Sequence, residues 1–124
     1  MPLDLDAYLG VHAQALRLRE HRTELLATNL ANADTPGYKS RDLDFKSALA
    51  AASSTANGKG ANATTGGTDA HLKYRVPLAP SLDGNTVDAQ LEQAAFAENA
   101  VRYQATLSFL SGKFRSLMTA ITGQ

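Results

Sequence analysis

The run FAENAVRYQATLSFLSGKFRSLMTAI, residues 96–121, decides the fold. Its apolar residues recur at alternating steps of 4 and 3, the heptad spacing of a helix that packs one seam against other helices. The members of this seam are Phe96, Ala100, Tyr103, Leu107, Leu110, Phe114, Leu117 and Ile121. We predict a helix over residues 87–121 that is roughly 50 Å long and ends at Gly123.

A second amphipathic helix is predicted over residues 4–31. Its apolar positions follow the same alternation, interrupted by Glu20, and comprise Leu9, Ala13, Leu16, Thr23, Ala27 and Leu30. A neighbouring stripe widens this face and comprises Val11, Ala15, Leu18 and Leu25. If the two terminal helices run antiparallel, we expect a basic cluster to meet an acidic one, namely Arg17, Arg19 and Arg22 against Asp88, Glu92 and Glu98.

Two helices in a chain of 124 residues and 13.1 kDa leave much of each apolar stripe uncovered. One interpretation is an intramolecular hairpin with a modest core. The one we favour is a subunit that completes its core by assembling. The predicted fold class is mainly α, with two long terminal helices forming a coiled-coil hairpin, joined by an extended or irregular middle with little β structure and a mobile loop. The expected subunit interface comprises Leu9, Leu16, Leu30, Phe96, Tyr103, Leu107, Leu110, Phe114, Leu117 and Ile121.

Composition divides the chain into segments. The stretch from 50 to 70 is rich in Ala, Ser, Thr, Gly and Asn and cannot bury enough apolar surface to offset its ordering entropy. Pro77 and Pro80 make the following segment an edge strand or irregular piece, and Thr86 or Asp88 can cap the last helix. The predicted divisions are an N-terminal coiled-coil helix (1–33), an elbow and outer contact segment (34–49), a low-complexity mobile loop (50–71), a short extended segment with a turn (72–86) and a C-terminal coiled-coil helix (87–124).

The elbow follows the first helix in the stretch LLATNLANADTPGYKSRDLDF, residues 25–45. Asn32 can end the helix in the left-handed conformation, and Pro36 with Gly37 fits the centre of a type II turn. The elbow motif comprises Asn29, Asn32, Asp34, Thr35, Pro36, Gly37 and Tyr38. It can serve as a helix stop or can aim the next segment at a neighbouring subunit, and residue chemistry alone leaves both open.

Charge and cysteine content exclude several function classes. Twelve basic and twelve acidic residues give a formal net charge of +0, which argues against a nucleic-acid binder and favours self-association. With no cysteine, disulfide scaffolds, thiolate metal sites and thiol catalysis are excluded. Asp4 and Asp6 interrupt any signal-like start, so we expect no cleavable signal peptide, and a protein that works outside the cytoplasm would leave by another route.

Candidate chemistry is sparse. His21 and Glu24 have the i, i+3 spacing of a metal-ligand pair, and a small helical enzyme or metal carrier is one alternative, but solvated surface residues are the interpretation we favour. The glycine-rich run around Lys59 does not match a phosphate-binding loop, and no serine has a nearby His–Asp pair. We therefore expect no enzyme activity, cofactor, metal or small-molecule substrate.

Two stretches resemble a known family. NLANADTPGYKSRDLDF, residues 29–45, resembles the N-terminal signature of bacterial flagellar rod and hook proteins. DGNTVD, residues 83–88, with Glu98-Asn99 and Arg102-Tyr103-Gln104 after it, is similar to the proximal-rod members. The resemblance covers both ends of the chain and is weak or absent across residues 50–70.

This resemblance implies a structural role in the flagellar basal body. The terminal helices would form the inner coiled-coil layer of a helical tube that transmits torque and surrounds the export channel, and the elbow would contact neighbours on the outside. The implied partners are the chain itself, other rod proteins, the membrane ring, the rod-base adaptor and the type III export apparatus. The implied place is the periplasmic side of the inner membrane. The alternative is a secreted helical adaptor or export substrate that binds a partner's coiled coil.

Overall fold

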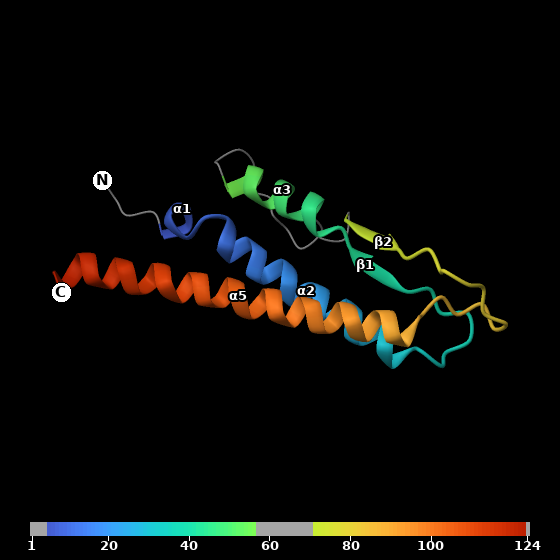
Figure 1. The fold of residues 1–124 in the computed structure, drawn as a ribbon. Helices are drawn as coiled ribbons and strands as arrows, with labels where there is room; N and C mark the ends of the chain where they lie inside the picture. The colour runs from blue at the N-terminus through green and yellow to red at the C-terminus, as the bar shows by residue number, and fades with distance from the viewer. Residues whose placement is uncertain (1–4, 57–70, 124) are drawn as a thin grey trace.

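Helices dominate residues 5–56 and 71–123, which the computed structural model describes (Figure 1). The chain begins with α1 (Leu5–Leu9), and α2 (Val11–Ala31) follows after Gly10. The C-terminal helix α5 spans Ala89–Thr122. The mainly α class is therefore confirmed. The first helix has a break that the sequence analysis did not predict, because Gly10 has a φ of 58°, a conformation that glycine adopts without steric cost.

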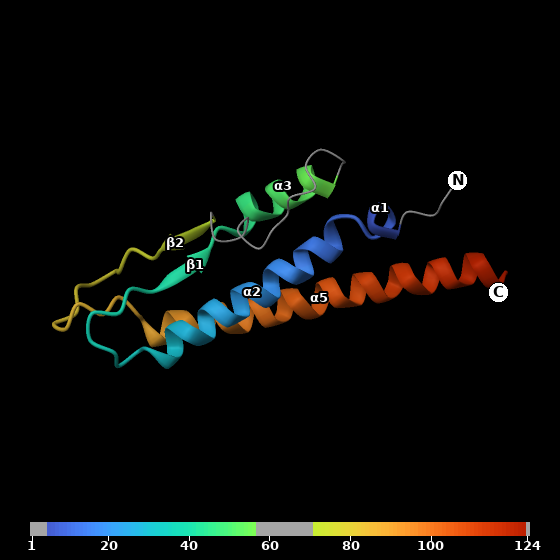
Figure 2. The ribbon, with the colours of Figure 1, turned by 180° about the vertical axis from the view of Figure 1, so that it is seen from behind.

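Helices α2 and α5 lie side by side and antiparallel, so α1 and the end of α5 lie at the same end of the molecule (Figures 1 and 2). The contacts between them follow one register. Residue numbers fall along α2 and α1 as they rise along α5, in the pairs Asn29–Glu92, Thr23–Asn99, His12–Phe109 and Tyr8–Lys113.

The middle of the chain contributes a small sheet. Strand β1 (Arg41–Leu43) pairs antiparallel with β2 (Leu72–Tyr74), with Arg41 opposite Tyr74 and Leu43 opposite Leu72. The extended character expected after residue 72 is realised in β2. At the other end of the segment, Asp88 caps α5 by accepting hydrogen bonds from the N–H groups of Gln90 and Leu91, as the sequence predicted.

Helix α3 (Phe45–Ala56) was not predicted. It replaces the end of the expected elbow and the expected loop over residues 50–56, while the rest of that loop, residues 57–70, lies outside the described residues. Asp44 explains where the helix begins, because its carboxylate accepts hydrogen bonds from the N–H (3.3 Å) and hydroxyl (3.0 Å) of Ser47. Alanines then supply the highest intrinsic helix propensity.

The apolar core lies between α2 and the layer formed by the sheet and α3. Leu18, Leu43 and Ala48 are buried there, and the partly buried residues packed around them are Leu25, Phe45, Leu49 and Leu72. The Arg19 guanidinium lies 4.1 Å from the centre of the Phe45 ring and covers one edge of this core. Among the described helices, none combines the length and hydropathy that a bilayer crossing requires.

Candidate functional site

The elbow is a tight turn whose geometry agrees only partly with the sequence expectation. The N–H of Tyr38 donates to the Thr35 carbonyl (3.2 Å), and Gly37 has a φ of 74°, as a type II turn requires. Asn32, however, has a φ of −104°, so the left-handed ending predicted for it is wrong. Its side chain instead donates to the Thr28 carbonyl (2.8 Å) and satisfies the helix end locally.

A second segment, residues 83–86, clasps this turn. The Nδ2 atom of Asn85 lies 2.9 Å from each of three carbonyl oxygens that follow α2, belonging to Asn32, Ala33 and Thr35. Asn85 is buried, so its amide replaces the water that these carbonyls would otherwise bind. Backbone hydrogen bonds continue the clasp, from the Gly37 N–H to the Asp83 carbonyl (2.9 Å) and from the Thr86 N–H to the Tyr38 carbonyl (3.0 Å).

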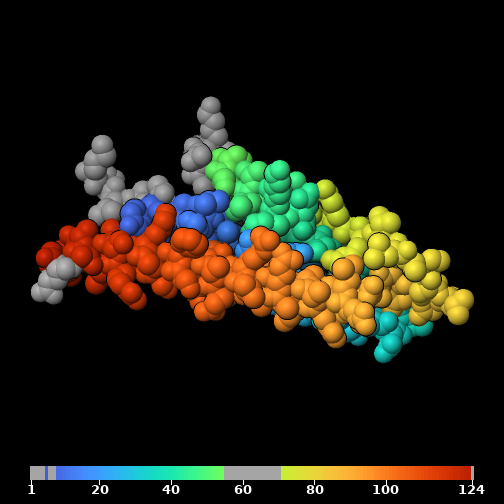
Figure 3. All heavy atoms as spheres, viewed as in Figure 1, coloured from blue at the N-terminus to red at the C-terminus, as the bar shows by residue number. Residues whose placement is uncertain are grey.

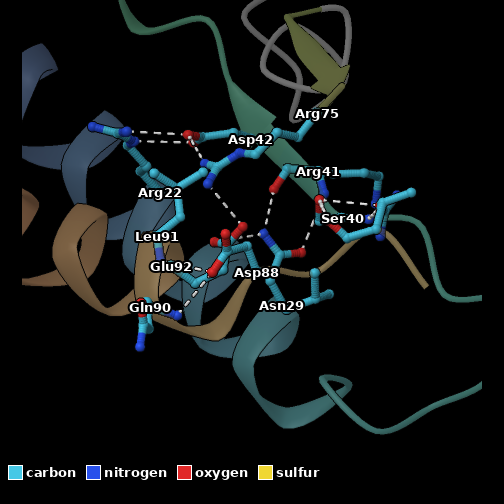
Figure 4. Close-up of polar contacts among 12 residues, drawn as sticks. Arg22, Asn29, Ser40, Arg41, Asp42, Arg75, Asp88, Gln90, Leu91 and Glu92 are labelled. Atoms are coloured by element: carbon cyan, nitrogen blue, oxygen red, sulfur yellow. Dashed lines mark hydrogen bonds and ion pairs between the residues drawn. The ribbon is translucent and has the colours of Figure 1, made fainter. Parts of the chain in front are cut away.

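A buried polar cluster lies beside the elbow (Figure 4). It joins α2, strand β1, the residue that follows β2, and α5. Glu92, fully buried on α5, forms an ion pair with Arg75 (2.8 Å) and accepts a hydrogen bond from Asn29 (3.1 Å). Asp42 receives two hydrogen bonds from Arg22, both 3.0 Å long, and one from Arg75 (2.7 Å). We call these five residues the polar node.

Charge balance holds the polar node together. Burial favours the neutral form of Asp42, but the hydrogen bonds and charge of Arg22, the Leu43 N–H and the charge of Arg75 outweigh it and lower the pKa of Asp42. The hydrogen bond with Asp42 in turn raises the pKa of Arg22 against the effect of its burial. Two cations and two carboxylates therefore compensate one another within a partly desolvated site.

Asn29 connects the polar node to the elbow. Its side-chain N–H group donates to the Arg41 carbonyl (2.7 Å), and its carbonyl oxygen accepts from the Arg41 N–H (3.2 Å). The Tyr38 hydroxyl also lies within hydrogen-bond distance of that oxygen (3.3 Å). The elbow motif is thus one connected structure, in which Asn29 is buried at the centre while Asp34, Thr35, Pro36 and Gly37 are exposed.

The face of α5 that contacts α2 is mostly polar. Its buried residues are Glu92, Asn99, Thr106 and Leu110, and the first three recur at steps of seven. Asn99 donates to the Thr23 hydroxyl (2.9 Å) and the Arg19 carbonyl (3.0 Å). The inner seam of the helix pair therefore runs beside the predicted apolar seam rather than along it.

The predicted interface residues fall into three groups of exposure. Leu110 is buried inside the chain and is not available as an outward contact, which corrects its predicted role. Leu9, Leu16, Leu30, Tyr103 and Leu117 are half-buried. The exposed group comprises Phe96 (37%), Leu107 (38%), Phe114 (46%) and Ile121 (65%). We call these four residues the α5 seam, and Figure 3 shows how much of α5 lies open along the molecule.

The predicted basic and acidic clusters do face each other across the helices, because the hydrogen bond of Asp42 is joined by the charges of Glu98 and Glu92 in raising the pKa of Arg22. The direct ion pairs, however, have other partners. Arg22 pairs with Asp42, and Glu92 pairs with Arg75. Glu98 pairs with Arg102 on its own helix (2.8 Å), because the i, i+4 spacing brings these two side chains together.

The His21–Glu24 pair does not gain further ligands. The two side chains lie 3.8 Å apart, and no group of three or more potential metal ligands occurs within residues 5–56 and 71–123. Sequence reasoning missed Arg75 and Asp42, whose meeting depends on the strand pairing. It also missed Asn99 and Thr106, although their seven-residue spacing from Glu92 was visible in the sequence.

Comparison with known proteins gives one family. Residues 9–39 match the family described as "Flagella basal body rod protein". The chain is 52% identical to the flagellar basal body rod protein FlgB of Cereibacter sphaeroides, covering 94% of each chain. It is 44% identical to FlgB of Escherichia coli, with 94% of each chain covered, and 40% identical to FlgB of Salmonella typhimurium, with 96% covered.

Proposed function

Because the chain belongs to the FlgB family of flagellar basal body rod proteins, we propose that it self-assembles through its terminal helices into the proximal part of the rod. The chain is a structural subunit of the basal body. The proposal adds that identical subunits build a helical tube that transmits torque and surrounds the export channel. The observation that carries it is the α5 seam, where four large apolar residues remain exposed along one helix.

Apolar burial drives this assembly in the proposal. Exposed apolar side chains in register along a helix lose contact with water when a neighbouring subunit covers them, which contributes about 25 cal/mol per Å² of area removed. The formal net charge of +0 opposes the approach of identical copies only weakly. In the assembled tube the antiparallel α2–α5 pair becomes the coiled-coil layer, and the half-buried residues Leu9, Leu16, Leu30, Tyr103 and Leu117 complete the interface.

The proposed divisions of the chain assign different tasks to its parts. The terminal helices (1–33 and 87–124) form the coiled-coil layer, and residues 34–49 form the elbow and outer contact surface. We assign the extended segment (72–86) to the clasp of the elbow. No part is assigned to catalysis, which agrees with the names of the relatives.

We further propose the partners and the place of the subunit. As a rod component of the basal body, it contacts other rod proteins. The proposed neighbours at its base are the membrane ring and the rod-base adaptor, on the periplasmic side of the inner membrane. The chain reaches that place through the flagellar type III export apparatus without a cleavable signal peptide.

The test is electron microscopy of envelope preparations from cells that lack this chain, with and without a plasmid copy. We expect rods and hooks to be absent from the deletion strain and restored by the plasmid. Complete flagella in the deletion strain would contradict the proposal. In that case a discrete complex of fixed stoichiometry with one partner would favour the secreted adaptor.

A further inference from the structure

A row of polar residues follows α5 at a spacing of seven positions, on the side that faces α2 and α1. Its members are Glu92, Asn99, Thr106 and Lys113. Three of them form hydrogen bonds across the helix pair. Glu92 accepts from Asn29 (3.1 Å), and Asn99 donates to the Thr23 hydroxyl (2.9 Å). Lys113 donates to the Tyr8 carbonyl (3.3 Å). We call these four residues the polar row.

Stability does not explain the asparagine in the polar row. Asn99 is 1% exposed, and its side-chain oxygen has no hydrogen-bond partner within the described part of the chain, an arrangement that costs free energy. The Arg19 carbonyl accepts from Asn99 (3.0 Å) but also from the Thr23 hydroxyl (2.9 Å). An apolar side chain at position 99 would therefore leave both facing groups partnered and would bury additional apolar area.

A competing arrangement of α5 would bury more apolar surface inside the chain. Each member of the polar row is followed four positions later by a large apolar residue, namely Phe96, Tyr103, Leu110 and Leu117. Residues four positions apart are separated by roughly 40° around a helix axis and about 6 Å along it. A small rotation of α5 with a shift along its axis would thus bring this apolar row against α2 and turn the α5 seam inward.

We propose that the polar row is a lock, which fixes the rotation and register of α5 against α2 so that the α5 seam stays turned outward. A polar Asn or Lys in a helix seam specifies register at a cost in stability, because its hydrogen bonds form in one arrangement only. Asn99 is the main positioning residue. The inference rests on the proposed function, since the seam that the lock keeps exposed is the surface which that function uses.

The polar node fixes α5 only at the elbow end, through Glu92. Asn99 lies about 10 Å further along the helix, and Lys113 lies about 30 Å from Glu92. Over that length the two helices can change their crossing angle while Glu92 keeps its partners. Each further polar contact therefore restricts the rotation of α5 where it occurs, and Lys113 extends the lock to the end that lies beside α1.

The test measures the position of α5 against α2 in the purified chain. Because the chain has no cysteine, Glu20→Cys and Ser111→Cys introduce the only two thiols, and both positions are exposed and lie outside the polar row. Nitroxide labels are attached to the two thiols, and pulsed electron paramagnetic resonance measures the distribution of distances between them. The same pair of labels is placed in each variant of the polar row.

We expect one narrow distance in the chain that carries only the labels. Asn99→Leu should at least double the width of the distribution, or add a second distance that differs by about 5 Å, because rotation and shift displace the label by that order. Adding Lys113→Leu should enlarge the second population. An unchanged distance in both variants would overturn the inference and leave the proposed function intact.

Two further variants serve as controls for the label distances. Gln104→Leu makes the same kind of change, from an amide to an apolar side chain, at an exposed position outside the polar row. It should leave the distance unchanged. Asn99→Gln keeps the amide donor and should show the single distance of the native chain.

Urea unfolding separates a lock from a residue that only stabilises the fold. We expect the Asn99→Leu chain to unfold at an equal or higher urea concentration than the native chain, while the number of rods in envelope preparations falls at least tenfold. A lower unfolding midpoint with a single unchanged distance would mean that Asn99 serves stability alone. Rods at the normal number would also overturn the inference. Failure of the proposed function is seen separately, as rods that persist when the chain is deleted.

Discussion

The two ends of the α2–α5 helix pair differ in which side chains they bury and which they expose. At the elbow end, Glu92, Asn29 and Asn85 are buried and hydrogen-bonded within the chain. At the other end, Phe109, Phe114 and Ile121 are exposed. Polar groups are thus paired inside the molecule at the elbow end. Exposed apolar groups lie along the helix at the other end, and they also occur at the elbow end in the segment before α5, at Val76, Leu78 and Leu82.

This difference separates folding from assembly. A buried polar group must find its partner within the chain, because an unsatisfied one costs about 1–3 kcal/mol. An exposed apolar group costs little in the isolated chain but contributes when a neighbour covers it. We therefore expect substitutions at the elbow end to change the stability of the isolated chain, and substitutions along the α5 seam to change assembly.

The largest effect on stability is expected from Glu92→Ala. Removing this buried carboxylate leaves Arg75 without its partner on α5 and takes away one of the two acceptors of the Asn29 amide, and breaking a buried ion pair costs about 3–5 kcal/mol. Urea unfolding of the purified chain, followed by circular dichroism at 222 nm, measures the loss of unfolding free energy.

Glu98→Ala is the matched control, because Glu98 forms an exposed pair with Arg102 and such pairs contribute about 0.5 kcal/mol or less. If the Glu92→Ala chain is too unstable to fold, Glu92→Gln can replace it. The glutamine keeps an acceptor for Asn29, so its loss of unfolding free energy should be intermediate. Equal stability of the Glu92→Ala and Glu98→Ala chains would show that the elbow end does not hold the fold together.

A second, smaller loss is expected from Asn85→Ala. The substitution leaves three carbonyl groups of the elbow without the amide that they share, and we expect a cost of about 1–3 kcal/mol. The same unfolding experiment measures it. Gln93→Ala provides the control, since Gln93 is exposed on α5. A loss no larger than that of the control would mean that water replaces the amide without cost.

How far the sequence predicts each end follows from the range of the interactions. The two long helices, the Asp88 cap and the turn at Gly37 depend on residues close together in the chain, and their signals are local. Helix α3 was missed because its alanines belong to a run whose composition is typical of a mobile segment. The break at Gly10 was missed because glycine within a helical pattern is often tolerated.

The candidate site was harder to predict because it depends on meetings between distant segments. Asp42 meets Arg75 through the pairing of β1 and β2, a register that no local pattern of three-residue strands specifies. The apolar heptad correctly identified large residues on one side of α5, but it did not reveal that α2 packs against Asn99 and Thr106 instead. A heptad predicts that a seam will be covered and does not say by which chain.

We expect the stability of the folded chain to decrease gradually as the pH is lowered. The folded chain holds the pKa of Asp42 below its ordinary value through Arg22 and Arg75, against the effect of burial, and Lys73 and Ser47 lower the pKa of Asp44 to about 2. A carboxyl group with a depressed pKa contributes stability above its unfolded pKa, near 4, and this contribution is lost as the pH falls through the folded pKa.

We therefore expect the free energy of unfolding to fall between about pH 4 and pH 2. Urea titrations at pH values from 6 to 2.5 would measure it. The Asp42→Asn variant should be less stable at pH 6 and should lose less stability on acidification than the native chain. An identical pH dependence of both chains would exclude Asp42 as a source of acid sensitivity.

The smallest effect on stability, with the strongest effect on assembly, is expected from Phe114→Asp. Phe114 is 46% exposed, and substitutions at such positions usually change stability by about 0.5 kcal/mol. The new carboxylate would nevertheless have to be desolvated against a neighbouring subunit, so rods should not form. Thermal unfolding of the purified chain and electron microscopy of envelope preparations measure the two effects in parallel.

Ser111→Asp adds the same charge at an exposed position outside the α5 seam and should support rods. Leu110→Asp cannot make this distinction, because Leu110 is buried within the chain and its loss would disturb folding as well as assembly. Normal rods from the Phe114→Asp chain would mean that the exposed apolar end of α5 is not the surface that assembly covers.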